Sequence, residues 1–290
     1  SLLEIFGGSM SHSGGVLEAG TLALTGGDIA VAAPGSLSVS SGDYTISLAS
    51  SSHTGDGTVT ISTATGEADL VLSEGSYDAG GTTTLGDDNG DVLVTAGTHA
   101  PAGAFVLNGA DGDLQVSGGS ITFGGTVTTN GGTGGVGVSL SGTLVNNALM
   151  TVNENLSVSG GSLDGTGDID VDGLVSLTGG ALGGDGRTIT AAGDWDESAA
   201  VFTAGTGTVI FDGTTPGLST VSAFNHLTVN GTSVTLSNAL DVNGNLAVSG
   251  SAELIDSGQT INAAGNVNFT GGDFTPTGTM IFDGTALQDV

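Results

Sequence analysis

The sequence predicts an all-β protein that folds as a parallel β-solenoid, with essentially no helix. Two observations carry this prediction. Short alternating runs of Val, Leu, Ile and Thr recur along the chain, separated by turns rich in Gly, Ser, Asn and Asp. A long block of sequence also returns at a fixed spacing, which is typical of proteins that stack successive repeat units on one continuous core.

The repeated block lies in the second half of the chain. Residues 188–195 read Thr-Ile-Thr-Ala-Ala-Gly-Asp-Trp, and residues 260–267, which begin 72 positions later, read Thr-Ile-Asn-Ala-Ala-Gly-Asn-Val. Residues 206–214 read Thr-Gly-Thr-Val-Ile-Phe-Asp-Gly-Thr, and a near-identical stretch begins 71 positions later. A fixed period of this length indicates that each copy holds about three or four coils of the solenoid.

We expect residues 1–290 to form a single solenoid of about 13–15 coils, because strands of one type recur about 18–24 residues apart. The tandem copies then occupy residues 168–239 and 240–290. Residues 1–10 are expected to form the first strand of the stack. An alternative is that they pair with a neighbouring subunit by adding to an open sheet edge.

In the first half, two-residue alternation predicts eight half-buried strands at 22–24, 29–31, 37–39, 44–48, 59–61, 70–72, 92–94 and 114–116. The most Gly-rich window, residues 124–137, is expected to be a loop or a joint, and strand patterning resumes at Val138. No segment combines a 3.6-residue apolar period with helix caps, so the helix content should be near zero.

The composition excludes several classes of partner. The chain has 30 Asp and Glu against one basic residue, Arg187, for a net charge of −29. Nucleic acids and anionic lipid surfaces are bound through clustered cations, so we expect no nucleic-acid binding and no membrane insertion. The lack of Cys excludes disulfides and thiolate metal sites. A start at Ser1 without a basic and apolar leader suggests a processed chain or a fragment.

The second half resembles the extracellular β-helix repeats of bacterial surface proteins. The resemblance rests on residues 207–213 (Gly-Thr-Val-Ile-Phe-Asp-Gly), 224–229 (Phe-Asn-His-Leu-Thr-Val) and 240–248 (Leu-Asp-Val-Asn-Gly-Asn-Leu-Ala-Val). Over residues 144–290 the chain is similar to filamentous haemagglutinin-like proteins and autotransporter-type adhesins. The first half of the chain is similar to them only in composition. This resemblance implies secretion to the cell surface, a right-handed β-helix, and a role as stalk, adhesin or fibre. Members of these families are usually much longer than this chain.

The best candidate for a metal site is the run Asp168, Asp170 and Asp172. In a strand these three carboxylates point to one face, while Ile169 and Val171 point into the core. Calcium takes six to eight oxygen ligands, so it is the metal that such a row would suit. The alternative is a solvated acidic face, with no cofactor required.

Two further acidic segments are weaker candidates for calcium. Residues 86–91 and 109–113 resemble the Gly-Asp turns of calcium-binding nonapeptide repeats, but they are not arranged in tandem.

The sequence predicts no enzymatic activity. Its four histidines (His12, His53, His99 and His226) have no acidic partner at metal-ligand spacing, and we interpret them as turn or surface residues. Solenoid glycoside hydrolases need paired carboxylates in a cleft. Lyases that act on anionic polysaccharides need cations, and Arg187 stands alone.

We therefore expect a secreted structural protein that forms a fibre, sheath or surface stalk by head-to-tail stacking with further copies of itself. The residues predicted to form the junction are Leu2, Leu3, Ile5, Phe6, Ile281, Phe282 and Val290. Phe211 is expected to lie either in the core or at the joint. The runner-up is an adhesin segment that binds a glycan or a host surface through its loops. Besides Phe, only Trp195, Tyr44 and Tyr77 offer aromatic platforms for a glycan.

An ice-binding solenoid is the third alternative. It would need Thr-x-Thr strands at the same position of every coil. Such strands occur at residues 58–60, 126–128 and 188–190, but their spacing along the sequence is irregular.

Overall fold

The structure is a computed structural model, and it describes residues 1–63, 69–86, 90–108, 112–130, 135–139, 141–285 and 287–289. These residues contain strands and turns and no helix, and the strands stack in parallel as a β-solenoid of about 13 turns. The predicted fold class is therefore confirmed. The chain divides into unit 1 (residues 1–154 and 161–165) and unit 2 (residues 155–160 and 166–290), which are described in turn.

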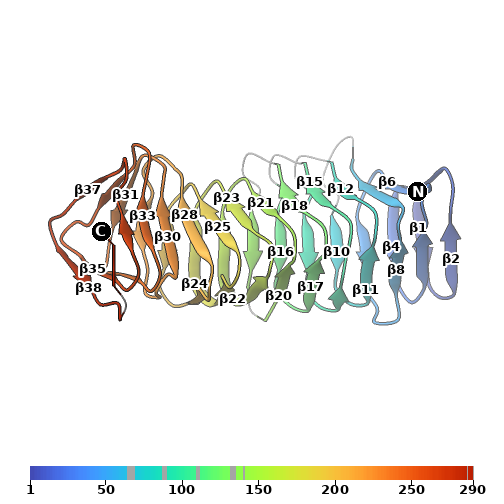
Figure 1. The fold of residues 1–290 in the computed structure, drawn as a ribbon. Helices are drawn as coiled ribbons and strands as arrows, with labels where there is room; N and C mark the ends of the chain where they lie inside the picture. The colour runs from blue at the N-terminus through green and yellow to red at the C-terminus, as the bar shows by residue number, and fades with distance from the viewer. Residues whose placement is uncertain are drawn as a thin grey trace. The chain divides into compact units, whose positions relative to one another are not determined.

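Unit 1 stacks its strands in three parallel ladders, which form the three faces of each turn (Figure 1). The first face contains β1 (Leu2–Ile5), β4 (Thr21–Leu24), β7 (Tyr44–Ile46), β10 (Leu70–Leu72), β13 (Val92–Val94), β16 (Leu114–Val116) and β19 (Val136–Val138). The second contains β2 (Ser9–His12), β5 (Asp28–Val31), β8 (Ser52–Gly55), β11 (Ser76–Ala79), β14 (Thr98–His99), β17 (Ser120–Phe123), β20 (Thr143–Asn146) and the last residues of β22 (Leu156–Gly165). The third contains β3 (Val16–Ala19), β6 (Ser36–Val39), β9 (Thr58–Ile61), β12 (Thr83–Leu85), β15 (Phe105–Leu107), β18 (Val127–Thr129) and β21 (Met150–Val152).

Unit 2 has the same three-sided turn. Its first face contains the start of β24 (Val175–Gly183), then β26 (Trp195–Glu197), β29 (Gly217–Ser219), β31 (Ser233–Leu236), β34 (Glu253–Ile255) and β37 (Asp273–Thr275). Its second face contains the end of β24, then β27 (Val201–Thr203), β32 (Leu240–Val242), β35 (Thr260–Ala263) and β38 (Thr279–Phe282). Its third face contains β23 (Ile169–Val171), β25 (Thr188–Ala191), β28 (Thr208–Phe211), β30 (His226–Val229), β33 (Leu246–Val248) and β36 (Val267–Asn268).

The core of each unit consists of columns of inward side chains that stack from turn to turn. Because side chains alternate along a strand, in-register pairing places like positions above one another. In unit 1 one such column runs Leu24, Ile46, Leu72, Val94, Val116 and Val138. In unit 2 another runs Ile169, Ile189, Val209, Leu227, Leu246 and Val267. All of these side chains are buried, and burying each contributes about 1.5–3 kcal/mol.

The tandem copies in unit 2 lie on different faces of the turn. β25 belongs to the third face, whereas its equivalent β35, 72 residues later, pairs with β32 and β38 on the second face. Likewise β26 lies on the first face and its equivalent β36 lies on the third. The repeat therefore does not fill a whole number of turns, and equal sequences do not lie directly above one another.

The repeated Phe-Asp-Gly corner has a steric explanation. At Gly213 an added Cβ would overlap the carbonyl oxygen of Ala192, and at the equivalent Gly284 it would overlap that of Ala264. Glycine lets two corners of successive turns approach this closely, so the repeat keeps it in both copies.

No helix among the described residues is long and apolar enough to span a membrane.

Candidate functional site

The three aspartates predicted to bind calcium flank and occupy strand β23. Ile169 and Val171 are buried and Asp170 lies between them on the outer side, as the alternation predicts. Partial burial raises the pKa of Asp170, and the nearby carboxylates of Asp172 and Asp212 raise it further. Asp168 instead accepts a hydrogen bond from the backbone N–H of Thr188, with an N–O distance of 2.7 Å.

Within the described part of the chain, no three His, Asp or Glu side chains converge as a metal site would require. Calcium binding by Asp168, Asp170 and Asp172 stays a prediction. The other two acidic segments include residues 87–89 and 109–111, which lie outside the described residues.

In unit 1, aspartates instead form a regular turn-to-turn contact. Asp69, Asp91 and Asp113 stand 22 residues apart at the start of successive first-face strands. An Oδ1 of each accepts the backbone N–H of the equivalent residue one turn later, at 3.0, 2.9 and 2.7 Å. The last of these donors is Gly135, and Asp43 accepts from Asp69 in the same way at 3.2 Å. We call this row the aspartate ladder.

Unit 2 uses the same contact at two equivalent corners of its tandem copies. Asp185 accepts hydrogen bonds from the backbone N–H and hydroxyl of Thr206, at 2.8 and 2.9 Å. Asp256 accepts from the N–H and hydroxyl of Thr277, at 2.8 and 2.7 Å, and also from the N–H of Gly278. Burial alone would raise the pKa of Asp256, but these hydrogen bonds outweigh it and lower the pKa to about 2.

The single basic residue of the chain also holds neighbouring turns together. Arg187 is buried, and its guanidinium donates hydrogen bonds to the carbonyl oxygens of Gly183 and Gly167. At the equivalent position of the second copy, Gln259 donates from Nε2 to the carbonyl of Ser237 at 3.2 Å. The charge of Arg187 is therefore used inside the fold and is not presented to an anionic ligand.

Glu197 is a second buried charged residue with a full set of partners. Its Oε2 accepts from the Thr220 hydroxyl at 2.6 Å and from the backbone N–H groups of Val221 and Ser222 at 3.2 and 3.1 Å. Its Oε1 accepts from the Ser222 hydroxyl. Because Glu197 lies in β26 and its donors lie in the next turn, this carboxylate pins the corner after β29. None of these contacts is with a second carboxylate, which paired acid–base chemistry would need.

The interpretation of the histidines as turn or surface residues is wrong for His53 and His99. Both are fully buried, because alternation in β8 and β14 turns them into the interior. His12 and His226 are half-buried, and Nδ1 of His226 accepts the backbone N–H of Asn245 at 2.9 Å.

The three aromatic residues proposed as glycan platforms, Tyr44, Tyr77 and Trp195, are also fully buried. They cannot serve as binding platforms at the surface. Trp195 packs edge-on against Phe202 and Phe224, with ring centroids 5.1 and 5.5 Å away.

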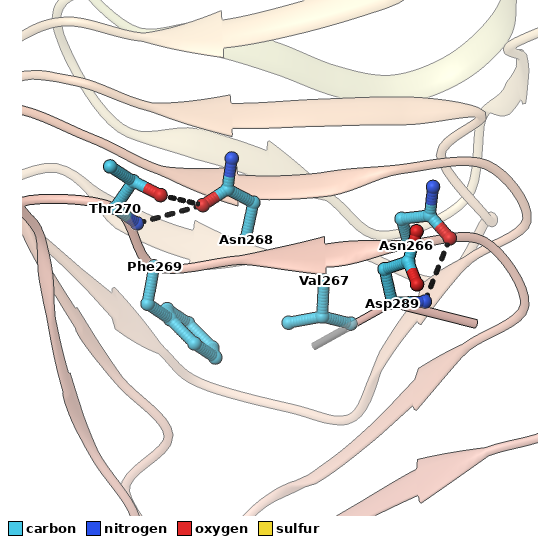
Figure 2. Close-up of a pocket in the computed structure, with 6 residues that line it drawn as sticks. All are labelled: Asn266, Val267, Asn268, Phe269, Thr270 and Asp289. Carbon is cyan, nitrogen blue, oxygen red and sulfur yellow. Dashed lines mark hydrogen bonds between the residues drawn. The ribbon is translucent and has the colours of Figure 1, made fainter.

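A hollow of about 570 Å³ lies beside β36 (Figure 2). Its lining residues are Asn266, Val267, Asn268, Phe269, Thr270 and Asp289. In Figure 2 the Val267 and Phe269 side chains point into the hollow, and the backbone N–H of Asp289 reaches Oδ1 of Asn266 at 3.1 Å.

The tandem repeat explains this hollow. In the first copy, Oδ1 of Asp194 accepts the N–H of Gly217, and β29 then pairs along β26. Asn266 and Asp289 are the residues 72 positions later, and β36 is the equivalent of β26. The hollow is thus the position that a further parallel strand occupies in the first copy. The first residue of β36 is already paired there, because the backbone N–H of Val267 donates to the carbonyl oxygen of Asp289 at 3.0 Å.

The predicted junction residues lie at the two terminal turns, where β1 and β37 each have one paired edge. Leu2 and Phe6 are 63 and 73 % exposed, and Leu3 and Ile5 are half-buried. Ile281 and Phe282 are exposed, and Val290 lies outside the described residues. Phe211 is fully buried, so of its two expected places, core or joint, it occupies the core. The role of the others in a junction stays a prediction.

The Thr-x-Thr strands of unit 1 are in register, although their sequence spacing is irregular. One outward row of the third face runs Ser38, Thr60, Thr84, Val106, Thr128 and Thr151. The row beside it runs Ser36, Thr58, Thr82, Ala104, Thr126 and Leu149. These twelve positions carry no charge, and the first row meets a carboxylate at Glu18, which pairs with Ser38. We call them the threonine face.

Comparison with protein-family models, with curated proteins and with solved structures found no match to this chain.

Proposed function

We propose that this chain is a structural segment of an extracellular fibre, sheath or surface stalk, which catalyses no reaction and extends by head-to-tail stacking of solenoid turns. The observation that carries the proposal is the use of its polar side chains. The aspartate ladder, Arg187, Glu197 and Asp256 all bond to the backbone or side chains of neighbouring turns. These polar side chains, which could otherwise bind a substrate, instead hold one turn to the next.

Stacking would pair the open edge of β1 in one copy with the open edge of β37 in another. Each of these strands is followed along the chain by a second-face edge strand, β2 and β38, so both edges are presented in the same order around the turn. Leu3 faces inward, opposite Leu22, and Phe274 faces inward, opposite Leu254. Parallel addition of strand to strand would therefore continue the apolar column across the junction.

The register of this junction follows from charge. If Ile5 stacked on Phe274, Glu4 would lie beside Asp273, and like charges directly opposite each other are destabilising. If Leu3 stacks on Phe274, Glu4 lies beside Thr275. We therefore expect the second register, in which Cα atoms of Glu4 and Thr275 stand about 4.8 Å apart on adjacent strands.

Because the chain contains no cysteine, engineered cysteines test this junction cleanly. The double variant Glu4→Cys/Thr275→Cys should form intermolecular disulfides and a ladder of oligomers on oxidation, since the expected Cα spacing suits a disulfide. The matched control is Glu4→Cys/Thr235→Cys. Thr235 lies in the same outward row as Thr275 but in β31, whose two edges are both paired. Equal cross-linking of both variants, or none in either, would contradict the stacking proposal.

A second candidate function, the binding of ice, is favoured by the threonine face. Parallel strands place its hydroxyl and methyl groups about 4.8 Å apart across strands and about 6.6 Å apart along them. An uncharged face of this regularity does not hold the strongly bound water that a carboxylate would. A regular uncharged grid is the surface that ice adsorption requires.

Inhibition of ice recrystallisation tests this candidate. The double variant Thr60→Asp/Thr128→Asp should abolish inhibition by the wild-type chain. Thr54→Asp/Thr122→Asp, which places the same charges on the second face of the neighbouring strands β8 and β17, should leave it unchanged. A wild-type chain without inhibition removes the candidate and leaves the structural proposal intact.

A further inference from the structure

Unit 1 contains a buried polar cluster that plays no part in the ladders, the open edges or the threonine face. It consists of Tyr44, His53, Tyr77, Thr83 and His99, and we call it the histidine cluster. We propose that it is an acid-sensitive latch. Uptake of a proton by His53 opens the turns that carry β7 to β12, while the core of unit 2 around Trp195 stays closed.

The cluster draws inward side chains from all three faces of the turn. Tyr44 belongs to the first face, His53 and Tyr77 to the second, and Thr83 to the third. The Tyr44 hydroxyl lies 2.7 Å from Nδ1 of His53, and the Tyr77 hydroxyl lies 2.7 Å from Oγ1 of Thr83. The His53 ring stacks at an angle on Tyr77, with centroids 4.9 Å apart. The imidazole thus contacts the first face through Tyr44 and, through Tyr77, is linked to the third face at Thr83.

The surroundings of His53 suit a neutral ring and not a charged one. A neutral imidazole has one donor and one acceptor nitrogen, and the Tyr44 hydroxyl can pair with Nδ1 in either tautomer. Nε2 is buried without a hydrogen-bond partner among the described residues. Protonation makes both nitrogens donors, so Nε2–H would need an acceptor that these neighbours do not offer. A buried charge without a partner is strongly unfavourable.

The residues that pair with His53 in the second face or contact its ring across the interior are uncharged. Its neighbours in the second face are Ile29 and Tyr77, and across the interior it meets Tyr44. Burial raises the pKa of both tyrosines, so they stay neutral in acid. The aspartates of the flanking strands, Asp28 and Asp78, occupy the alternate, outward positions.

His99, two turns further along the second face, differs from His53 in having compensating partners. Its Nε2 lies 2.8 Å from the carbonyl oxygen of Ala96. Burial lowers the pKa of His99, but this hydrogen bond and the carboxylate of Asp78 oppose the shift. His53 has no such compensation, so it is the residue whose protonation should open the cluster.

The sign of the effect follows from proton linkage. Burial lowers the pKa of His53 to about 4, whereas an exposed histidine titrates near pH 6.5. Between these values the open state binds a proton that the closed state does not, so opening becomes easier as pH falls. At pH 4.5 the ratio of open to closed turns should exceed its neutral value on the order of 100-fold.

The chain carries separate reporters for its two units. Tyr44 and Tyr77 are the only tyrosines and lie in the cluster, while Trp195, the only tryptophan, lies in unit 2. The experiment follows tyrosine exposure by second-derivative absorbance and tryptophan emission during an acid titration. In the wild-type chain the tyrosine signal should change while the tryptophan signal stays constant. His53→Phe should remove the tyrosine transition, and the control His12→Phe should keep it.

A direct NMR titration of the His53 ring in the wild-type chain decides the matter even if His53→Phe does not fold. Protonation below pH 5, together with tyrosine exposure, supports the latch. Protonation near pH 6.5, a tyrosine transition that His53→Phe leaves in place, or simultaneous exposure of Trp195 would overturn it.

Discussion

Replacing Glu197 by alanine removes one buried carboxylate and leaves its hydrogen-bond donors in place. The donors are the backbone N–H groups of Val221 and Ser222 and the hydroxyls of Thr220 and Ser222. The Thr220 hydroxyl keeps a second partner, since it also lies 2.9 Å from the carbonyl oxygen of Ser222. The two backbone N–H groups lose the side chain that pins this corner.

The expected cost follows from these contacts. Each buried donor left without an acceptor costs about 1–3 kcal/mol, so two such groups would cost about 2–6 kcal/mol in the free energy of unfolding. Because both N–H groups are only part-buried, we expect a loss in the lower half of this range. This is a large part of the 5–15 kcal/mol that is typical of folded proteins. Glu197→Gln keeps one acceptor oxygen for these donors and replaces the other oxygen by an NH2 group. Because one acceptor remains, this variant should lose less stability than Glu197→Ala.

Urea unfolding followed by Trp195 emission measures this cost, because the single tryptophan lies in the same strand as Glu197. The matched control is Asp196→Ala, which changes an exposed carboxylate between these two residues and should alter stability by less than about 0.5 kcal/mol. If Glu197→Ala unfolds at the same urea concentration and with the same slope as Asp196→Ala, the proposed role of Glu197 is wrong.

Three further predictions follow from the tandem copies of unit 2. Arg187→Gln, which installs the residue found at the equivalent Gln259, should destabilise the chain by about 1–2 kcal/mol in thermal or urea unfolding, and less than Arg187→Ala does. Asp256 has a pKa lowered to about 2, so its contribution to stability is present above pH 4 and is lost as pH falls toward 2. Asp256→Asn should therefore lower stability at pH 6 and flatten its acid dependence, and an unchanged pH profile would refute this. Gly213→Ala should lower the melting temperature, because its Cβ would overlap the Ala192 carbonyl. The control is Gly186→Ala, where no atom lies near the added Cβ. Only the backbone strain of a φ of 72° should lower its melting temperature.

The fold class could be predicted from the sequence because its main determinant is local. Alternating aliphatic residues in strands such as β4, β9 and β13 specify one buried side, and the turn residues between them limit strand length. The repeat at 71–72 residues then indicated stacking. Its placement on different faces could not be predicted, because it depends on how many strands complete each turn.

On the second face of unit 1, sequence reasoning predicted β5 at residues 29–31 but missed the later strands β8, β11 and β14. Strands β8, β11 and β14 carry Ser, His, Tyr, Asp and Thr in place of alternating aliphatics, so they gave no apolar pattern. His53 and Tyr77 were consequently interpreted as surface residues. They are buried because the strands above and below them in the ladder fix the register, which is a tertiary effect.

The turn-to-turn contacts were predictable only in part. Asp69, Asp91 and Asp113 recur every 22 residues in front of an apolar strand, and that regular spacing is a signal that the sequence contains. The partners of Glu197 come from an irregular corner around residues 220–222. These residues do not recur at a regular spacing, so the sequence alone did not predict this contact. Single buried carboxylates of this kind become visible only once the turns are placed.

Electron microscopy of the purified chain over a range of concentrations, with calcium and with a chelator, tests the central claim most directly. Stacking of solenoid ends predicts filaments of uniform width that lengthen with protein concentration. Loss of these filaments in chelator would show that carboxylates at the junction bind calcium. Single short particles at every concentration, in both conditions, would contradict the proposal that the chain builds a fibre.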